Sequence, residues 1–294
     1  MEKVFREFHI KKRRDRKSKP KKNLLVVICL FLSLLLSPFS SYAEWTFNKI
    51  YKFDSVPNGV SVSKDGSIGY VVTYDGMCCK FIAGKLIESF HVSGNICQDV
   101  ALRSKNSDNG VWILDSGDEL IEGYLSEDKL QFKTIYKFNS QPNAIALSSN
   151  GNIGFAAEED GSIDEFVNGK FFKVIAKQDV PCTAIATTYD GTKVWFITAR
   201  DELYQGIYTS QSEWKFDKIY KCTYTPTDIA LSSNGSIGYI IGSSGIISYL
   251  KDGKLISTKQ YKIPNGVIAI DTTADGKKLW ITTGDFSLIE AVDK

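Results

Sequence analysis

Histidine is nearly absent from this 294-residue sequence, which contains only His9 and His91. Arginine is also scarce after residue 43, where only Arg103 and Arg200 remain. Multi-histidine metal centres are therefore excluded, and a Ser-His-acid triad would have to use His91. A site that binds the carboxylate of a sugar through three arginines is excluded as well, because only two arginines remain. The residues needed for these types of active site are missing.

Helical signals are also missing after residue 43. Apolar residues there do not recur at the 3.6-residue period of a helix, and short β-branched and aromatic runs alternate with Asp-Gly, Asn-Gly and Gly-Lys turns. Such runs are typical of β-strands. Without a strand-to-helix turn, the chain has no glycine-rich loop of the kind that cradles phosphate. The sequence offers no catalytic residue, so an enzyme is the less favoured interpretation.

Residues 1–43 form a segment of their own. They contain 11 Lys and Arg and 3 acids, and they enclose the apolar run Leu24–Leu36. Ser41-Tyr42-Ala43 then places small residues where a signal peptidase cleaves. The run is shorter than the roughly 18 residues expected of a spanning helix. We expect a signal peptide at 1–43 and an exported chain at 44–294, periplasmic or secreted. An uncleaved membrane anchor stays the alternative.

The chain after residue 43 is acidic, although the whole sequence carries a formal charge of +2. Because 11 of the 36 bases and 3 of the 34 acids precede residue 44, the remainder carries about −6. A nucleic-acid partner is not expected, since binding would need clustered bases on the folded domain. The length suits one large domain, which we expect to be a monomer.

Five cysteines follow the signal segment: Cys78, Cys79, Cys97, Cys182 and Cys222. An odd number leaves at least one unpaired, and their spacing fits no zinc template, so no metal site is expected. Neighbours on one strand point to opposite sides, which disfavours a bridge between Cys78 and Cys79. If a bridge forms, Cys78 or Cys79 with Cys97 is the least strained pairing. The simplest interpretation is that they are small buried apolar residues.

Internal repeats organise the rest of the sequence. The segment Phe47–Phe53 recurs as Phe132–Phe138 and as Phe216–Cys222, at offsets of 85 and 84 residues. Downstream, Pro57–Tyr70 recurs as Pro142–Phe155 and as Pro226–Tyr239. Each of these long units divides again, because its second half carries Val111-Trp112, Val194-Trp195 or Leu279-Trp280 where the first half carries Gly-aromatic. The basic module is therefore about 42 residues and occurs six times.

A module of this length with four short strands is the size of one propeller blade. The sequence thus predicts an all-β fold, a six-bladed β-propeller at 44–294 with blades starting near 58, 98, 143, 183, 227 and 268. The first module begins one strand early, at 45–53, and the last ends one strand early. We expect the N-terminal strand to close the ring as the outer strand of the last blade, which removes two open sheet edges.

The blade pattern resembles the YVTN and NHL class of bacterial β-propeller repeats. Val60-Ser-Val-Ser-Lys-Asp-Gly66 and Val194-Trp-Phe-Ile-Thr198 carry the likeness. The resemblance implies architecture more than activity, and the Thr-Asn that ends the repeat in that family's name is missing here. The Gly-His and Trp-Asp pairs of WD40 repeats are missing as well.

Propellers of this kind usually bind ligands on the side that carries the loop into each innermost strand. We call this side the channel-mouth face; it also carries the turn between the second and third strands of each blade. The predicted ligand-binding residues at the channel mouth are Asn58, Gln98, Asp99, Asn143, Thr227 and Asp228, and those in a neighbouring turn are Glu158, Glu159 and Asp160. Further acids expected on this face are Asp75, Asp115, Asp118, Asp201 and Asp285.

Bases gather on the other side of the expected disc, which we call the opposite face. They are Lys64, Lys85, Arg103, Lys105, Lys129, Lys170, Lys193, Lys254, Lys277 and Lys278. An acidic channel-mouth face would attract basic partner segments or cations. The competing interpretation is that turns are polar because they face water.

The favoured function is an exported, non-enzymatic scaffold that binds a protein or peptide partner, with a basic segment, through its acidic channel-mouth face. No cofactor is required by this function, and a membrane contact is expected only through an uncleaved signal. The alternative is a calcium-dependent hydrolase similar to the six-bladed lactonases. Asp99, Asp228, Asn58 and Asn143 could supply some calcium ligands there, and Asp271 is the one acid expected deeper in the channel.

Overall fold

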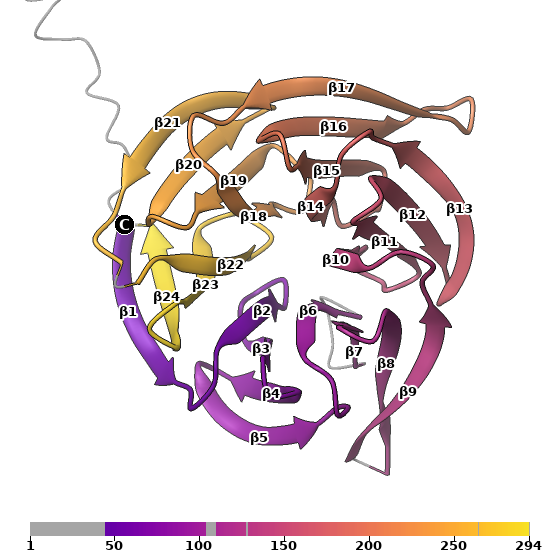
Figure 1. Ribbon diagram of the computed structural model, residues 1–294. Coiled ribbons are helices and arrows are strands. Elements are labelled where there is room, and N and C mark those ends of the chain that lie inside the picture. The colour runs from indigo at the N-terminus through magenta and orange to yellow at the C-terminus, as the bar shows by residue number, and fades with distance from the viewer. Residues whose placement is uncertain (1–44, 104–109, 128, 264, 294) are drawn as a thin grey trace, which may run out of the picture. The chain divides into compact units, whose positions relative to one another are not determined.

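The computed structural model describes residues 45–103, 110–127, 129–263 and 265–293, and the regular elements of this part are all β-strands. They form six four-stranded antiparallel sheets arranged around a central axis (Figure 1). The described residues contain no helix that is long and apolar enough to span a membrane. The expected signal segment 1–43 and Lys105 lie outside the described residues.

The sheets follow the repeat. Blade 1 comprises β2 (Pro57–Val62), β3 (Ile68–Thr73), β4 (Met77–Ile82) and β5 (Lys85–His91), and blade 2 comprises β6 (Cys97–Leu102), β7 (Val111–Asp115), β8 (Glu119–Ser126) and β9 (Lys129–Lys137). Blade 3 comprises β10 (Pro142–Leu147), β11 (Ile153–Glu158), β12 (Ser162–Val167) and β13 (Lys170–Lys177), and blade 4 comprises β14 (Cys182–Thr187), β15 (Lys193–Thr198), β16 (Glu202–Tyr208) and β17 (Trp214–Lys221). Blade 5 comprises β18 (Pro226–Leu231), β19 (Ile237–Gly242), β20 (Ile246–Lys251) and β21 (Lys254–Gln260).

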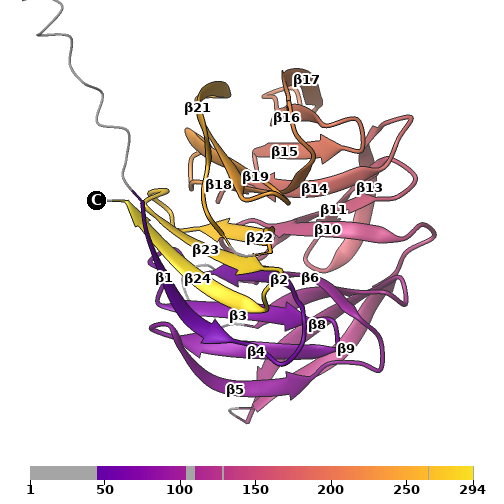
Figure 2. The same cartoon turned by 60° about the vertical axis from the view of Figure 1, so that its left-hand side comes forward.

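Blade 6 joins the two ends of the chain. It comprises β22 (Val267–Thr272), β23 (Lys278–Thr283) and β24 (Ser287–Asp293), completed by β1 (Trp45–Lys52). β1 pairs antiparallel with β24 from Trp45↔Asp293 to Lys52↔Ser287, and Figure 2 shows the two strands side by side. The predicted fold class is confirmed, including the ring closure by the N-terminal strand.

The apolar core lies between the blades rather than inside them. Six clusters of buried side chains each draw on two neighbouring sheets. In three of these interfaces an indole ring of one blade covers a glycine of the next. Trp112 of β7 faces Gly154, Trp195 of β15 faces Gly238, and Trp280 of β23 faces Gly69.

The glycines leave the space that the indole rings fill. A Cβ on Gly154 would lie 2.5 Å from the ring of Trp112, and one on Gly69 would lie 2.2 Å from the ring of Trp280. In the intervening interfaces, the ring of the Gly-aromatic half takes the place of the indole. Tyr70, for example, lies in one buried cluster with Val111. The alternation of Gly-aromatic and Val-Trp halves in the sequence therefore reflects two kinds of blade contact.

A methyl group at Gly154 should destabilise the ring. We expect Gly154→Ala to lower the free energy of unfolding by about 1–3 kcal/mol, because the packed indole of Trp112 leaves no room. Gly94→Ala is the matched control, since a Cβ there meets nothing within 4 Å. Urea denaturation of both variants measures the difference, and equal stabilities would contradict the interlock.

Candidate functional site

The predicted channel-mouth residues lie on the innermost strands, where their side chains join one blade to the next. Asn58 Nδ2 donates to the carbonyl oxygen of Cys97 (2.9 Å), and Asn143 Nδ2 donates to that of Cys182 (3.0 Å). Each acceptor belongs to the innermost strand of the following blade. These asparagines therefore link neighbouring innermost strands through their amide N–H groups.

Gln98 and Thr227 occupy the same repeat position as these asparagines and also form hydrogen bonds to the next blade. Gln98 Nε2 donates to the carbonyl oxygen of Pro142 (3.1 Å). Thr227 Oγ1 donates over longer distances to Ile241 O within its blade (3.4 Å) and to Val267 O in the next (3.5 Å). The polarity at this position thus has a structural reason.

Asp99 and Asp228 lie one residue further along and also bridge blades. One carboxylate oxygen of Asp99 accepts from the N–H of the following residue (2.8 Å) and the other from Ile145 N in blade 3 (2.8 Å). Asp228 repeats this with the residue after it (2.7 Å) and with Ile270 N in blade 6 (2.8 Å). Each carboxylate pairs two backbone donors that the channel would otherwise leave unpaired.

Asp271 extends the bridges around the ring. Its Oδ2 accepts from Val62 N (2.8 Å) and from Ser61 Oγ (3.1 Å), both in blade 1. Ser61 Oγ in turn accepts from Leu102 N in blade 2 (3.0 Å). Side-chain oxygens therefore link blades 5, 6, 1, 2 and 3 in succession around the channel.

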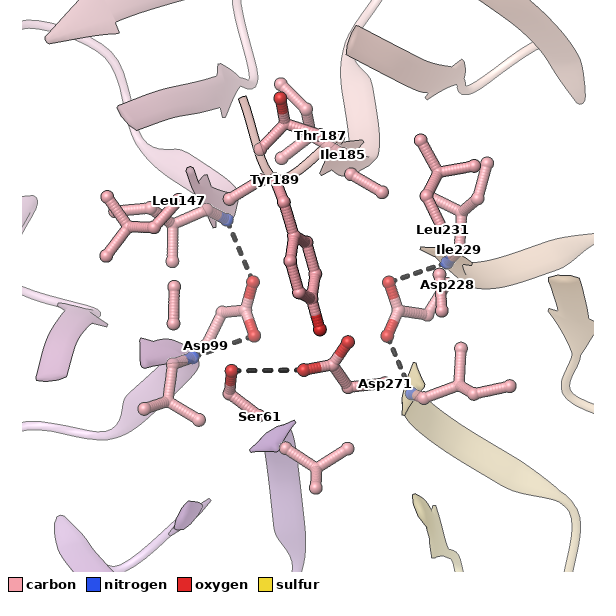
Figure 3. Close-up of a pocket in the computed structure, with 18 residues that line it drawn as sticks. Ser61, Asp99, Leu147, Ile185, Thr187, Tyr189, Asp228, Ile229, Leu231 and Asp271 are labelled. Carbon is pink, nitrogen blue, oxygen red and sulfur yellow. Dashed lines mark hydrogen bonds between the residues drawn. The ribbon is translucent and has the colours of Figure 1, made fainter. Parts of the chain in front are cut away.

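Tyr189 fills the channel from the opposite face. It belongs to the turn after β14, where its N–H donates to Ser233 O (2.9 Å) and its carbonyl oxygen accepts from Ser149 N (2.8 Å). Its ring stands in the channel, with the hydroxyl end toward Asp99, Asp228 and Asp271 (Figure 3). That hydroxyl is buried and has no hydrogen-bond partner among the described residues.

The surroundings alter the acidity of these groups. The pKa of the Tyr189 hydroxyl is raised by burial and by the negative charge of Asp271. Burial and the nearby charge of Asp99 raise the pKa of Asp228 well above its ordinary value, against the lowering effect of its two backbone hydrogen bonds. The channel therefore carries less negative charge than its three carboxyl groups suggest.

The space left around Tyr189 is small. The cavity has a volume of about 60 Å³ and is lined mainly by branched apolar side chains of the innermost strands, together with Ser61, Asp99, Asp228 and Asp271. A few water molecules fit such a volume. Pockets for small-molecule ligands are typically about 300–1,000 Å³. The channel is therefore filled by side chains and has only a few polar groups in its lining.

Nor do the acids converge as a metal site. In the described ranges, no group of three or more His, Cys, Asp or Glu side chains has a geometry that could hold a metal ion. Asn58 and Asn143, the expected companions of Asp99 and Asp228, are engaged by carbonyl oxygens of neighbouring blades.

Glu158 does not lie on the channel-mouth surface as expected. Its side chain is 5% exposed, and Asp164 beside it on β12 is equally buried. Both stand on the face of blade 3 that carries Ala156, which packs against Phe138 and Leu120 of blade 2. Burial and the neighbouring Asp164 raise the pKa of Glu158, and burial likewise raises that of Asp164.

Glu159 and Asp160 remain on the surface, in the turn after Glu158. Glu159 accepts from Asn143 Nδ2 (3.2 Å), and Asp160 forms an ion pair with Lys177. Other acids of this face are paired as well, such as Asp179 with Arg200 (2.7 Å) and Asp285 with Lys49 (3.2 Å). The bases that neutralise them come largely from the outermost strands.

All five cysteines of the propeller are free and buried. Cys78 and Cys97 belong to the same core cluster between blades 1 and 2. Burial raises the pKa of Cys97, Cys182 and Cys222 to about 12. These thiols therefore stay protonated at neutral pH and are poor nucleophiles.

Comparison with known proteins supports the fold alone. The sequence matches no protein-family model and no curated protein. Among solved structures, the chain is similar to the β-propeller domain of Cps50 (Swd1) from Myceliophteria thermophila, with a TM-score of 0.63 and 11% sequence identity. The match covers 81% of this chain and 82% of that one. At this identity the likeness is one of architecture.

Substitutions of Asp99 and Tyr189 test whether the aspartates hold neighbouring blades together. We expect Asp99→Ala to lower the free energy of unfolding by about 2–4 kcal/mol, because it leaves buried backbone donors unpaired. Tyr189→Phe should keep or slightly raise the stability, because its hydroxyl has no partner in the described residues. Guanidinium denaturation compares the two, and a larger loss in Tyr189→Phe would contradict the assignment.

The buried carboxyl pair should make stability depend on pH. The folded-state pKa of Glu158 exceeds its ordinary value of 4.5, so the folded protein binds more protons above that pH. Its contribution is fully present below about pH 4.5 and is lost as the pH rises toward the folded-state pKa.

Glu158→Gln should therefore be more stable than the natural protein at about pH 8.5 and should show a flatter profile between about pH 5 and 9. The exposed neighbour provides the control, since Glu159→Gln should leave the profile unchanged. Melting temperatures across this range check both variants. An unaltered slope in Glu158→Gln would show that the pKa of Glu158 is not raised in the folded state.

Proposed function

We propose that the protein is an exported, non-enzymatic β-propeller scaffold that binds a protein or peptide partner on its channel-mouth face. The filled channel carries this proposal. Tyr189 and the bridging aspartates leave about 60 Å³, so a ligand of ordinary size has to bind on the loops outside it. β-Propellers commonly present such loops to protein partners, and the signal-like segment at 1–43 supports export.

A basic segment is the partner chemistry that we propose for this face. Asp118, Glu159 and Asp201 stand in three successive turns between second and third strands, in blades 2, 3 and 4. No ion pair with another described residue neutralises these three carboxylates, whereas several of their neighbours are paired. The exposed ring of Tyr74, 55% accessible in the equivalent turn of blade 1, adds an apolar contact.

The test is binding of a nine-residue polylysine peptide, measured by calorimetry at low and physiological salt. Asp118→Asn, Glu159→Gln and Asp201→Asn combined should weaken binding about fivefold or more, and added salt should weaken it further. Asn fits the left-handed backbone of Asp118 and Asp201, whose φ values are 61° and 61°.

The matched control neutralises an acid on the opposite face. Asp252→Asn sits in a turn with φ of 49° and should leave peptide affinity unchanged. Equal losses in both variants would indicate a non-specific charge effect. Binding that ignores both salt and the triple substitution would contradict an acidic docking face.

A further inference from the structure

Three hairpins on the opposite face share one turn type. In blades 1, 3 and 5, the third strand returns as the fourth through Ala83-Gly84, Asn168-Gly169 and Asp252-Gly253. Their φ values are 49° and 73°, 52° and 77°, and 49° and 75°. Two successive positive φ angles are typical of the type I′ turn, which makes tight hairpins. The three tips are therefore alike in shape.

The residues after each turn are also alike. They read Lys85-Leu86-Ile87, Lys170-Phe171-Phe172 and Lys254-Leu255-Ile256. The third member is 55%, 60% and 47% exposed, in Ile87, Phe172 and Ile256 respectively. A single exposed apolar residue needs no explanation, but the same exposure at three equivalent positions forms a patterned surface. We call these nine residues the Lys-apolar triads.

The lysines of the triads are available for an external charge. Lys85, Lys170 and Lys254 are exposed, and none of them forms an ion pair with another residue in the described ranges. Asp252 is the one acid among the six turn residues. Each tip thus offers a cation next to apolar side chains.

The topology places all three tips on one side of the disc. In an antiparallel four-stranded blade, the first-to-second and third-to-fourth connections share a side. Inner connections on this side are joined by backbone hydrogen bonds, as from Ala274 N to Lys64 O (2.9 Å) and from Ser233 N to Ala274 O (2.9 Å). The tips belong to alternate blades, so they stand at the corners of a triangle on the rim, where β5, β13 and β21 lie in Figure 1.

We propose that the Lys-apolar triads are a three-point contact with the surface of an anionic lipid bilayer. Three separated tips on one side of a rigid ring can touch a flat, extended partner at once, whereas a small protein would span only one or two. Apolar side chains beside lysines suit the headgroup region, which such groups enter to a depth of about 5–10 Å. The third residue after the turn lies within about 10 Å of the tip.

Two other blades also carry exposed apolar and basic residues at this rim. Leu125 at the end of β8 is 43% exposed, and Ile207 and Tyr208 at the end of β16 are 41% and 39% exposed. Lys129 and Lys215 follow these two hairpins. The same two hairpins also carry the acids Glu127 and Glu213, so the proposed contact rests on the tips of blades 1, 3 and 5.

Two tryptophan reporters test the contact in the full chain. Phe172→Trp marks a triad, and Tyr74→Trp is the matched reporter on the channel-mouth face, where the natural residue is 55% exposed. Vesicles contain brominated phosphatidylcholine with 30% phosphatidylglycerol or with none. We expect the emission added by Phe172→Trp to shift to the blue and to be quenched in anionic vesicles, and that of Tyr74→Trp to stay unquenched.

A charge variant tests the lysines with the same reporter. Each lysine near an anionic surface contributes roughly fivefold to affinity. Lys85→Gln, Lys170→Gln and Lys254→Gln together should weaken vesicle binding by about tenfold or more. Lys262→Gln, on the channel-mouth side, is the control and should have no effect.

Three results would overturn the proposal. The first is a Phe172→Trp reporter that stays unquenched on anionic vesicles, and the second is equal quenching in vesicles without phosphatidylglycerol. The third is found without lipid: if the natural chain self-associates in sedimentation experiments and Phe172→Ser makes it monomeric, the triads form a protein interface instead. Because these readouts concern the opposite face, they do not depend on peptide binding at the channel mouth.

Discussion

The ring depends on the fit of an indole side chain against a glycine at alternate blade interfaces. Neighbouring blades contact each other through the side chains on the facing surfaces of their sheets. Each interface must therefore be filled without a gap. Trp112, Trp195 and Trp280 supply the bulk, and Gly154, Gly238 and Gly69 supply the room. A large ring opposite a residue without a side chain sets the separation of the sheets. The two kinds of interface explain why the repeat unit spans two blades.

Closing the ring in this way determines what the channel can do. The innermost strands bring backbone donors close to the axis, where little water is present to pair with them. Asp99, Asp228, Asp271 and Ser61 accept hydrogen bonds from these donors, and Tyr189 occupies the remaining volume. Polar residues that resemble a binding site are thus largely used to hold the blades together. The surfaces left for recognition are the two faces of the disc and its rim.

The two faces differ in chemistry for a topological reason. One carries the acids of the turns between second and third strands, many of them paired with bases from outer strands. The other carries lysines beside exposed apolar side chains at the tips of the outer hairpins. A rigid ring keeps these two sets apart, so the two proposed contacts lie on separate surfaces.

The fold could be predicted from the sequence because the repeat is a local pattern. Strand runs, turn pairs and the recurrence of Phe47–Phe53 require no knowledge of distant contacts, and they led to six blades and the closing strand. The innermost strands β2, β10 and β18 begin at Pro57, Pro142 and Pro226, at the start of the recurring segments.

The roles of the site residues depend on partners about 40 residues away along the chain. Nothing near Asn58 or Asp99 in the sequence indicates that a carbonyl or an amide of the next blade will meet the side chain. Glu158 ends β11 and borders a surface turn, and only the packing of blade 3 on blade 2 buries it. The special role of Tyr189 could have been noticed in the sequence. In the turn after the innermost strand, the equivalent residues are Lys64, Ser149, Ser233 and Ala274, and Tyr189 is the aromatic one among them.

By itself, the sequence determined the number of blades, their strands and the closure of the ring, because hydrophobic period and turn chemistry act between near neighbours. The tertiary structure alone decided that the channel is filled, which acids are buried and which apolar side chains beside the lysines are exposed. These properties arise when six sheets meet around one axis, where the space and the hydrogen-bond partners of each side chain come from another blade.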